Sequence, residues 1–414
     1  MVLDMAQDRS APELFELADE QSPRRPASPK VVLGWGLGVE STAILVRWLL
    51  EPSSRDFELD DLVVLTALTG DEFSVTHQLV EAHVLGLLRQ QQVRLVQVCR
   101  AGQKESDGIV VVDDSRQPSR SHRHGPWRLS DELRSAGTVP QYAAGRRLCS
   151  IRAKGSVLDR WLAEHIEGSF RHVIGFNVEE TSRVLRDRSY SSAARQSEYP
   201  LVDWGWSRQD CEAYLEGVFS VPWHKSCCGF CPFRGGSLDE VFDDWDLDQP
   251  AALDALLLER RAMALNDKMT LYAGSSALDA AIARRPQTAW AFAELLERSE
   301  HSLVDLRRIV PASKADPGKK APGWRSVRVQ RSGSLEDCEQ HLAALAEERG
   351  LVVEVDEHGI ARAYELRRSG SLPDLEWFYV VCPAGVLDKE RSGFEARWEA
   401  LASPAATLFS KVAS

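Results

Sequence analysis

The sequence predicts an α/β protein with a doubly wound, mostly parallel sheet, followed by a helical extension that contains cysteines and a small C-terminal α+β module. Short apolar runs have the length of buried strands, at residues 30–35, 62–70, 93–99 and 171–177. Segments with apolar residues at helical spacing separate these runs, as at residues 75–91. A glycine turn and a helix-like segment follow the first run, so the alternation predicts parallel βαβ units.

Composition along the chain divides it into five segments. The stretch at 101–147 is polar and too long for a simple connection, so we expect a functional flap or insertion there. Residues 239–310 look helical, and SKADPGKKAPG has the composition of a linker. The predicted segments are a disordered N-terminus at 1–29, the α/β domain at 30–215, the cysteine cluster and helical extension at 216–312, the linker at 313–323 and the α+β module at 324–414.

Bulk properties limit the class of protein. The chain has 414 residues, 43% of them hydrophobic and 27% charged, which is ordinary for a globular protein of two or three domains. It has no apolar run long enough to span a bilayer, and its acidic N-terminus does not resemble a secretory signal. We therefore expect a cytoplasmic protein without a membrane partner. The net charge of −12 argues against a surface coated for non-specific DNA binding, but it allows a local basic groove.

The segment GWGLGVESTAIL (34–45) predicts an anion site. It joins a strand end, a glycine turn and a helix start that carries hydroxyl groups. Gly36 and Gly38 let backbone N–H groups approach a phosphate, and Ser41 and Thr42 sit where the helix dipole is positive, next to Glu40. The same pattern also fits an ordinary glycine-rich turn between a strand and a helix.

Four further segments contain candidate site residues. A positively charged side chain and a hydroxyl group at the start of a helix are suited to bind a phosphate or sulfate group. Each of the four segments, taken alone, also has a purely structural explanation. The segments are TGDEFSVT (69–76) with Gly70 and Asp71, RRLCSIRAKGSVLDRWL (146–162) with Arg147, Cys149 and Lys154, IGFNVEETSRV (174–184) with Gly175 and Arg183, and YPLVDWGWSRQDCEAYL (199–215).

In order along the chain, these five segments resemble motifs of the ATP-pyrophosphatase / phosphoadenosine-phosphosulfate reductase (PP-loop) superfamily, whose fold is called adenine nucleotide alpha hydrolase-like. The resemblance covers about half of the chain. The first segment is similar to the SGGxDS loop, with departures at Gly36, Leu37 and Glu40. The resemblance implies that residues 36–42, Gly70, Asp71 and Gly175 bind ATP with Mg²⁺. It also implies that Arg147, Lys154 and Arg183 act on the anionic substrate.

The segment HKSCCGFCPFRGG (224–236) predicts metal or redox chemistry. Cys228 and Cys231 have the spacing of a metal-binding turn, and adjacent Cys227 and distant Cys149 bring the number of thiols to four. Four thiolates are the full count for a [4Fe–4S] cluster. Zinc, and a metal-free structural or redox site, remain alternatives.

The PP-loop resemblance permits two chemistries. In one, ATP is split to AMP and pyrophosphate while an acceptor is adenylated for sulfur transfer; a cysteine desulfurase would be the sulfur donor, and DNA phosphorothioation is the specific hypothesis. In the other, a thiolate attacks a sulfonucleotide, but the chain ends in ATLFSKVAS and lacks the ECGLH-type tail of the assimilatory reductases. We therefore favour the ATP-using enzyme, which would work with a nucleic-acid substrate or the partner subunits of a modification system. The reductase and a non-catalytic nucleotide-sensing subunit are the alternatives.

Overall fold

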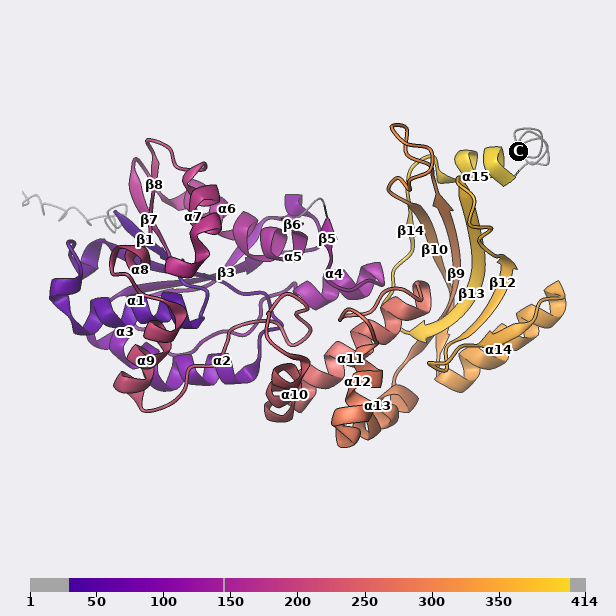
Figure 1. Cartoon of the computed structure of the whole chain (residues 1–414), viewed down its shortest axis with the longest axis horizontal. Helices are drawn as coiled ribbons and strands as arrows, with labels where there is room; N and C mark the ends of the chain where they lie inside the picture. The colour runs from indigo at the N-terminus through magenta and orange to yellow at the C-terminus, as the bar shows by residue number, and fades with distance from the viewer. Residues whose placement is uncertain (1–29, 144–145, 403–414) are drawn as a thin grey trace, which may run out of the picture.

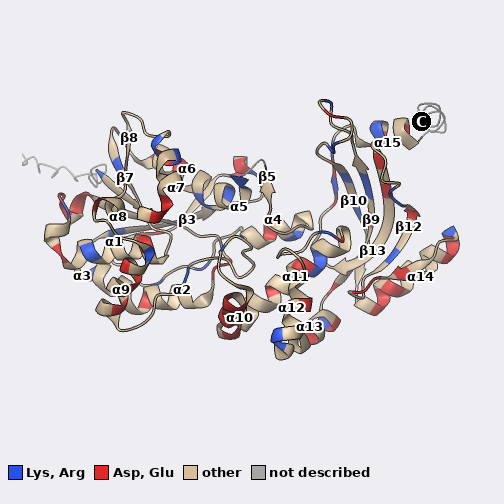
Figure 2. Cartoon of the chain, in the orientation of Figure 1, with Lys and Arg blue, Asp and Glu red and all other residues tan. Residues whose placement is uncertain are grey.

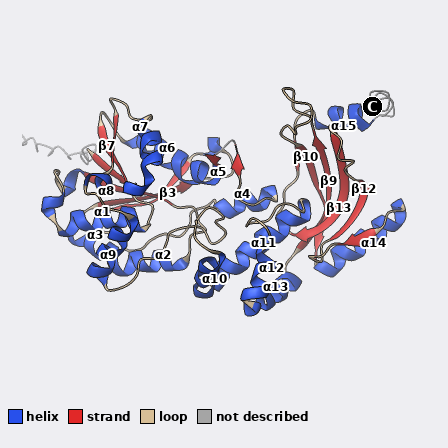
Figure 3. Cartoon of the chain, viewed as in Figure 1, coloured by secondary structure: helices blue, strands red, loops and turns tan. Residues whose placement is uncertain are grey.

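The computed structural model describes residues 30–143 and 146–402. The expected disordered segment 1–29 lies outside the described residues. Figure 1 shows one sheet with its helices at the N-terminal end of the long axis, a second sheet at the other end, and a group of helices between them. Figure 3 shows the same division by secondary structure.

The first sheet is six-stranded and mostly parallel, as predicted. Its order is β4-β3-β2-β1-β7-β8, and only the β3–β4 pair is antiparallel. The four predicted strands are confirmed as β1, β2, β3 and β7, whereas β4 lies inside the stretch predicted to be a flap. The bounds are β1 Val31–Gly34, β2 Leu62–Ala67, β3 Arg94–Arg100, β4 Ile109–Ser115, β7 Phe170–Ile174 and β8 Arg195–Glu198.

Helices cover both faces of this sheet. Alternate residues of the central strands belong to different apolar clusters: Leu33 packs with α1 on one face, while Val32 packs with α6 on the other. Burial on both faces explains why these strands read as continuous apolar runs. The bounds are α1 Val39–Leu50, α2 Ser74–Leu79, α3 Leu85–Gln90, α4 Leu129–Ala136, α5 Leu148–Ser150, α6 Ser156–His165, α7 Thr181–Arg188, α8 Pro200–Asp203 and α9 Arg208–Phe219; Val80–Val84 and Ile151–Gly155 are π-helical. A two-stranded ribbon, β5 Tyr142–Ala143 with β6 Arg146–Arg147, precedes α5.

The helical extension lies between the two sheets and ends earlier than the sequence predicted. Its helices are α10 Leu238–Leu247, α11 Gln249–Leu265, α12 Ala277–Arg284 and α13 Pro286–Arg298. Residues 301–310, which looked helical, form the strand β9. Most β9 residues are buried, because α11 packs on one face of this strand's sheet and α14 on the other. Burial on both faces removes the polar–apolar alternation by which a strand is normally recognised.

The second sheet is antiparallel, with the order β11-β12-β13-β9-β10-β14. The predicted linker at 313–323 joins β9 to β10, which are neighbours in this sheet, so the segment is a hairpin loop and not a connection between domains. The α+β module therefore begins at β9. The bounds are β9 His301–Val310, β10 Trp324–Gly333, α14 Leu335–Arg349, β11 Val353–Val355, β12 Ala361–Leu366, β13 Asp374–Pro383, β14 Lys389–Glu390 and α15 Phe394–Ala402.

Candidate functional site

The predicted anion loop lies where the first sheet changes direction. The strand β1 lies between β2 and β7, and both pairings are parallel. The chain leaves β1 through α1 toward β2, and it leaves β7 through α7 toward β8, so the connections after these two neighbouring strands run toward opposite edges of the sheet. In open α/β sheets, ligands bind in the crevice at such a switch point. The loop that follows β1, and the first turn of α1, lie at this switch point.

The backbone of this loop has an unusual conformation at Leu37. Its φ angle is 58°, in the left-handed region that favours glycine, and its side chain is only 1% exposed. The carbonyl of Leu37 accepts a hydrogen bond of 3.2 Å from the indole of Trp223. The Gly36 amide donates to Ser41 Oγ over 3.2 Å. The loop thus forms a glycine-like turn with leucine at this position.

The loop after β7 packs directly on the start of α1. A Cβ atom added to Gly175 would lie 2.8 Å from the amide nitrogen of Ser41, which is too close for any side chain. Two of the predicted segments therefore meet at this contact. Thr42 is fully buried, and its hydroxyl accepts a hydrogen bond of 2.9 Å from Trp35, so it serves the packing of the loop. Glu40 forms an ion pair of 2.8 Å with Arg208.

The loop after β2 contains the predicted site residues Gly70 and Asp71 and contacts the start of α4. The carboxylate of Asp71 accepts a hydrogen bond of 2.8 Å from the amide of Ser130, at the start of α4. Burial raises the pKa of Asp71 to about 6, although its hydrogen bonds to Ser130 act in the opposite direction. Gly70 has a φ of 90° and lies against Arg128, where an added Cβ would approach the Arg128 Cγ to 2.7 Å.

The turn that contains Cys227, Cys228 and Cys231 (the cysteine turn) is bonded through its backbone to the loop after β2. The Gly229 amide donates to the Asp71 carbonyl over 2.9 Å, and Glu72 pairs with Cys228 in an antiparallel bridge. The Phe73 amide donates to the Cys227 carbonyl over 3.3 Å. These bonds place the predicted metal-binding turn at the carboxyl end of the sheet, beside the predicted nucleotide loop.

The four predicted cysteines belong to one apolar cluster. Burial raises the pKa of Cys227 to about 12, with a further contribution from Cys231. Burial also raises the pKa of Cys149, and Cys231 adds to that shift, so these thiols lie near one another. All four are free thiols. Within the described part of the chain, no three His, Cys, Asp or Glu side chains are arranged to hold a metal ion directly.

A buried ion pair between the anion loop and the cysteines was not predicted. Lys154 Nζ lies 2.7 Å from Glu72 Oε1, and the Glu72 side chain is only 2% exposed. Burial alone would lower the pKa of Lys154, but the charge of Glu72 raises it above its ordinary value. Ser226 Oγ donates to the Gly36 carbonyl over 3.0 Å and lies 3.5 Å from Glu72 Oε1. Glu72 occurs within the TGDEFSVT motif, but only its burial reveals its role.

The other two predicted cations lie on the periphery. Arg147 is exposed on β6 and donates to the Tyr142 hydroxyl over 2.9 Å. Burial raises the pKa of Cys231, and the charge of Arg147 acts against that rise. Arg183 is exposed on α7, where it pairs with Glu180 and covers the ring of Phe176 at 4.4 Å. The structure therefore brings Lys154 and Arg147 toward the cysteines, whereas Arg183, on α7, forms a local ion pair with Glu180.

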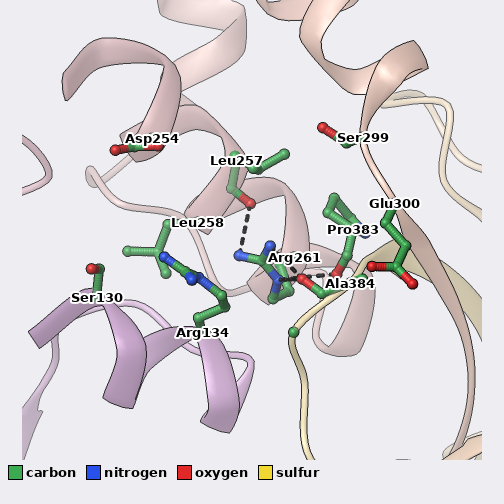
Figure 4. Close-up of a pocket in the computed structure, with 11 residues that line it drawn as sticks. Ser130, Arg134, Asp254, Leu257, Leu258, Arg261, Ser299, Glu300, Pro383 and Ala384 are labelled. Carbon is green, nitrogen blue, oxygen red and sulfur yellow. Dashed lines mark hydrogen bonds between the residues drawn. The ribbon is translucent and has the colours of Figure 1, made fainter. Parts of the chain in front are cut away.

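A cavity of about 410 Å³ lies between α4, α11 and the C-terminal sheet, and it borders the site at Ser130, whose amide donates to Asp71. Figure 4 shows Arg134 and Arg261 pointing into it from α4 and α11. Arg261 donates to the carbonyl of Ala384 over 2.7 Å, so this arginine holds the C-terminal module against the helices. None of the residues around the cavity belongs to the predicted site.

None of the helices in the described residues is long and apolar enough to cross a bilayer. The chain matches no protein-family model, and no curated protein matches it at a significant level.

Proposed function

We propose that this chain is a PP-loop type ATP pyrophosphatase that activates an acceptor for sulfur transfer. The observation that carries the proposal is the contact between Gly175 and Ser41 at the switch point of a mostly parallel sheet. It joins two segments that are 134 positions apart and that each resemble a motif of the PP-loop superfamily. The adenine nucleotide alpha hydrolase-like fold is part of the same proposal.

The phosphates of ATP would bind at residues 36–42. The first turn of a helix presents free N–H groups and a positive dipole to an anion, and the glycines let it approach. Gly38 precedes α1 without a side-chain cap, which leaves these N–H groups for a ligand. Mg²⁺ would enter with the phosphates; Asp71 is the nearby acid that has no ion pair among the described residues, since Glu40 is paired with Arg208.

The chemistry follows from that placement. An acceptor oxygen attacks the α-phosphorus of ATP, the bond to the β-phosphate breaks, and pyrophosphate leaves. A sulfur nucleophile, supplied by a donor such as a cysteine desulfurase, then displaces AMP. Lys154 is the cation between the anion loop and the cysteines, and its positive charge would stabilise the charge that develops on the phosphates.

We further propose that Cys149, Cys227, Cys228 and Cys231 hold a [4Fe–4S] cluster. The donor set fits, because four thiols occupy one partly buried cluster with the cations Arg147 and Lys154 beside them. Such a cluster binds each thiolate through a different iron, so it does not need the close convergence that a single zinc ion demands. A cluster would supply redox or sulfur-binding chemistry. Iron, sulfide and zinc content of anaerobically purified protein decides between the cluster and zinc.

The test of the function is pyrophosphate release from ATP by the purified protein, with and without sulfide. We expect release that depends on ATP and Mg²⁺. Ser41→Ala should weaken ATP binding by about 1–3 kcal/mol in calorimetry, because a hydroxyl next to a charged phosphate is lost. Thr42→Val is the matched control, because it keeps the backbone N–H groups of the loop and removes a fully buried hydroxyl that already accepts a hydrogen bond from Trp35. It should lower stability but leave ATP affinity intact.

Two results would redirect the proposal. ATP binding without pyrophosphate release would indicate a nucleotide-sensing subunit. Thiol-dependent sulfite release from a sulfonucleotide would indicate the reductase.

A further inference from the structure

A strongly basic segment borders the candidate site. Residues 116–154 carry nine basic and two acidic side chains, although the whole chain has a net charge of −12. Acidic side chains gather instead on helices such as α10 and α14, which Figure 2 shows largely in red. The chain thus concentrates positive charge in one segment. A local excess of basic residues in an acidic protein is typical of a surface that binds an anionic partner.

Several arginines of this segment have no ion pair. Among the described residues, most arginines elsewhere are neutralised, as Arg285 is by Asp243 and Asp246. Four of the unpaired arginines are exposed: Arg120, Arg123, Arg146 and Arg147. A fifth, Arg128, is partly exposed. A guanidinium that has no carboxylate partner in the folded chain can bind a phosphate without first breaking an ion pair.

This positive charge reaches the candidate site. The side chain of Arg128 lies against Gly70, in the loop after β2. The charge of Arg123 contributes to the lowered pKa of His77, for which burial is the larger cause, and His77 Nε2 lies 4.0 Å from Glu72. The basic segment therefore continues from the protein surface to the loop that carries Asp71 and Glu72.

One exposed aromatic ring, Tyr142, and one partly exposed ring, Phe233, accompany the arginines. Tyr142 is 56% exposed, and its ring centroid lies 4.5 Å from that of Phe233. The guanidinium of Arg147 lies 5.3 Å from the Phe233 ring, and Phe233 comes two residues after Cys231. Flat aromatic and guanidinium groups at the surface stack on nucleobases, and the bases must be unpaired to reach them.

We propose that the described parts of this segment, residues 116–143 and 146–154, together with Phe233, bind an unpaired nucleic-acid strand. Its bases would stack on Tyr142, Phe233 and Arg147, and its phosphates would contact the unpaired arginines. This inference rests on the proposed function, because it names the chemical class of the acceptor. The acidic helix α10 packs against the cysteine turn, where Trp245 donates to the Gly229 carbonyl over 2.9 Å. Its charge would repel phosphates, so the strand would run on the side of α5.

Fluorescence anisotropy of the full chain tests this inference. The probes are a labelled single-stranded DNA of about 20 nucleotides, which exceeds the site size of a typical single-strand-binding domain, its RNA counterpart, and the corresponding DNA duplex. We expect the single strands to bind more tightly than the duplex, with an affinity that falls as salt rises. Arg123→Gln/Arg146→Gln should lower the slope of log K against log salt by about two.

The aromatic contribution is tested separately from charge. Tyr142→Ala should weaken single-strand binding about fivefold or more. Tyr142→Phe keeps the ring and should bind like the wild type. Arg298→Gln/Lys314→Gln removes the same two charges from exposed positions on α13 and the β9–β10 loop, and should also bind like the wild type.

Each opposing outcome has a clear meaning. Equal loss in the Arg298/Lys314 control, or no effect of Tyr142→Ala, overturns the inference, because binding would then depend on net charge alone. Tighter binding of the duplex overturns it as well. ATP binding is measured on the same wild-type sample. A chain that binds ATP but no oligonucleotide overturns only this inference, whereas one that binds the oligonucleotide but no ATP overturns only the proposed function.

Discussion

Leu37 is a leucine in a backbone conformation that favours glycine. A left-handed φ costs an L-residue about 1–2 kcal/mol, whereas burying a leucine contributes about 1.5–3 kcal/mol. Burial therefore outweighs the strain, and the loop keeps its turn with leucine at φ 58°. The carbonyl of Leu37 is fixed by Trp223, so the turn cannot relax without breaking that hydrogen bond.

This balance predicts a reversal of the usual order of glycine and alanine. Both Leu37→Ala and Leu37→Gly lose the buried side chain, but only glycine relieves the backbone strain. Leu37→Gly should therefore be less destabilising than Leu37→Ala by about 1 kcal/mol. At Leu45, which is buried inside α1, the order should be the opposite, because glycine disfavours a helix. Urea denaturation of the four variants measures both differences, and the same order at both positions would contradict the assigned φ.

Glu259 gives the stability of α11 a dependence on pH. Its carboxylate is 1% exposed and accepts backbone hydrogen bonds from Leu271 and Ala277. Burial raises the pKa of Glu259 to about 7, above an ordinary value of 4.5. Because the folded pKa is the higher one, folding disfavours the ionised form. The contribution of Glu259 to stability therefore falls as the pH rises from about 4.5 to 7, by up to about 3 kcal/mol.

Replacing Glu259 by Gln should remove this part of the pH dependence. The variant is expected to be less stable at low pH, because its single carbonyl oxygen cannot serve both amides. Its unfolding free energy should change less between pH 5 and pH 8 than that of the wild type. Parallel pH profiles for the two proteins would show that Glu259 ionises normally in the folded state.

At the scale of elements, the Glu72–Lys154 pair joins the loop after β2 to the π-helix that precedes α6. The Lys154 side chain is 32% exposed and that of Glu72 only 2%. The loss of stability therefore depends on which of the two residues is replaced. Removing Lys154 would leave the buried Glu72 carboxylate without its counter-charge, whereas removing Glu72 would leave a Lys154 ammonium that water still reaches. The connection between these elements therefore depends on both residues together.

A double-mutant cycle tests this connection. Glu72→Gln should cost about 2 kcal/mol, because water still reaches the lone Lys154, and Lys154→Met should cost more, because Glu72 is buried alone. The double variant should be more stable than the sum of the single effects predicts. Chemical denaturation gives the three values. Simple additivity would show that the two charges do not interact in the folded protein.

On the scale of the whole molecule, α11 connects the two sheets. One part of α11 packs with the cysteine-containing cluster and its C-terminal end packs beneath β9 and β13. Buried arginines add polar bonds across the boundary: Arg362 donates to the Met263 carbonyl over 2.6 Å, and Arg261 to the Ala384 carbonyl over 2.7 Å. The C-terminal module is therefore attached through a shared core.

Limited trypsin digestion should reveal this attachment. Lys314, Lys319 and Lys320 are exposed in the β9–β10 loop and offer cleavage sites. Because β9 pairs with both β10 and β13, a cut there should leave the fragments bound to each other. They should co-elute in native gel filtration and separate only in denaturant. Two folded fragments that separate under native conditions would instead support the linker expected from the sequence.

The sequence alone determined the parts of this protein that local pattern controls. Continuous apolar runs identified β1, β2, β3 and β7, and the glycine turn before Ser41 located the start of α1, because strand burial and helix starts leave a signature in neighbouring residues. Only the tertiary structure decided what distant residues do to one another. Residues 301–310 form a central strand because α11 and α14 cover the two faces of its sheet, and Gly175 lies against Ser41 only in the folded chain. The tertiary structure also buried Glu72 with Lys154, 82 positions away, a pairing that no local pattern encodes because its free energy comes from desolvation and charge in the folded state.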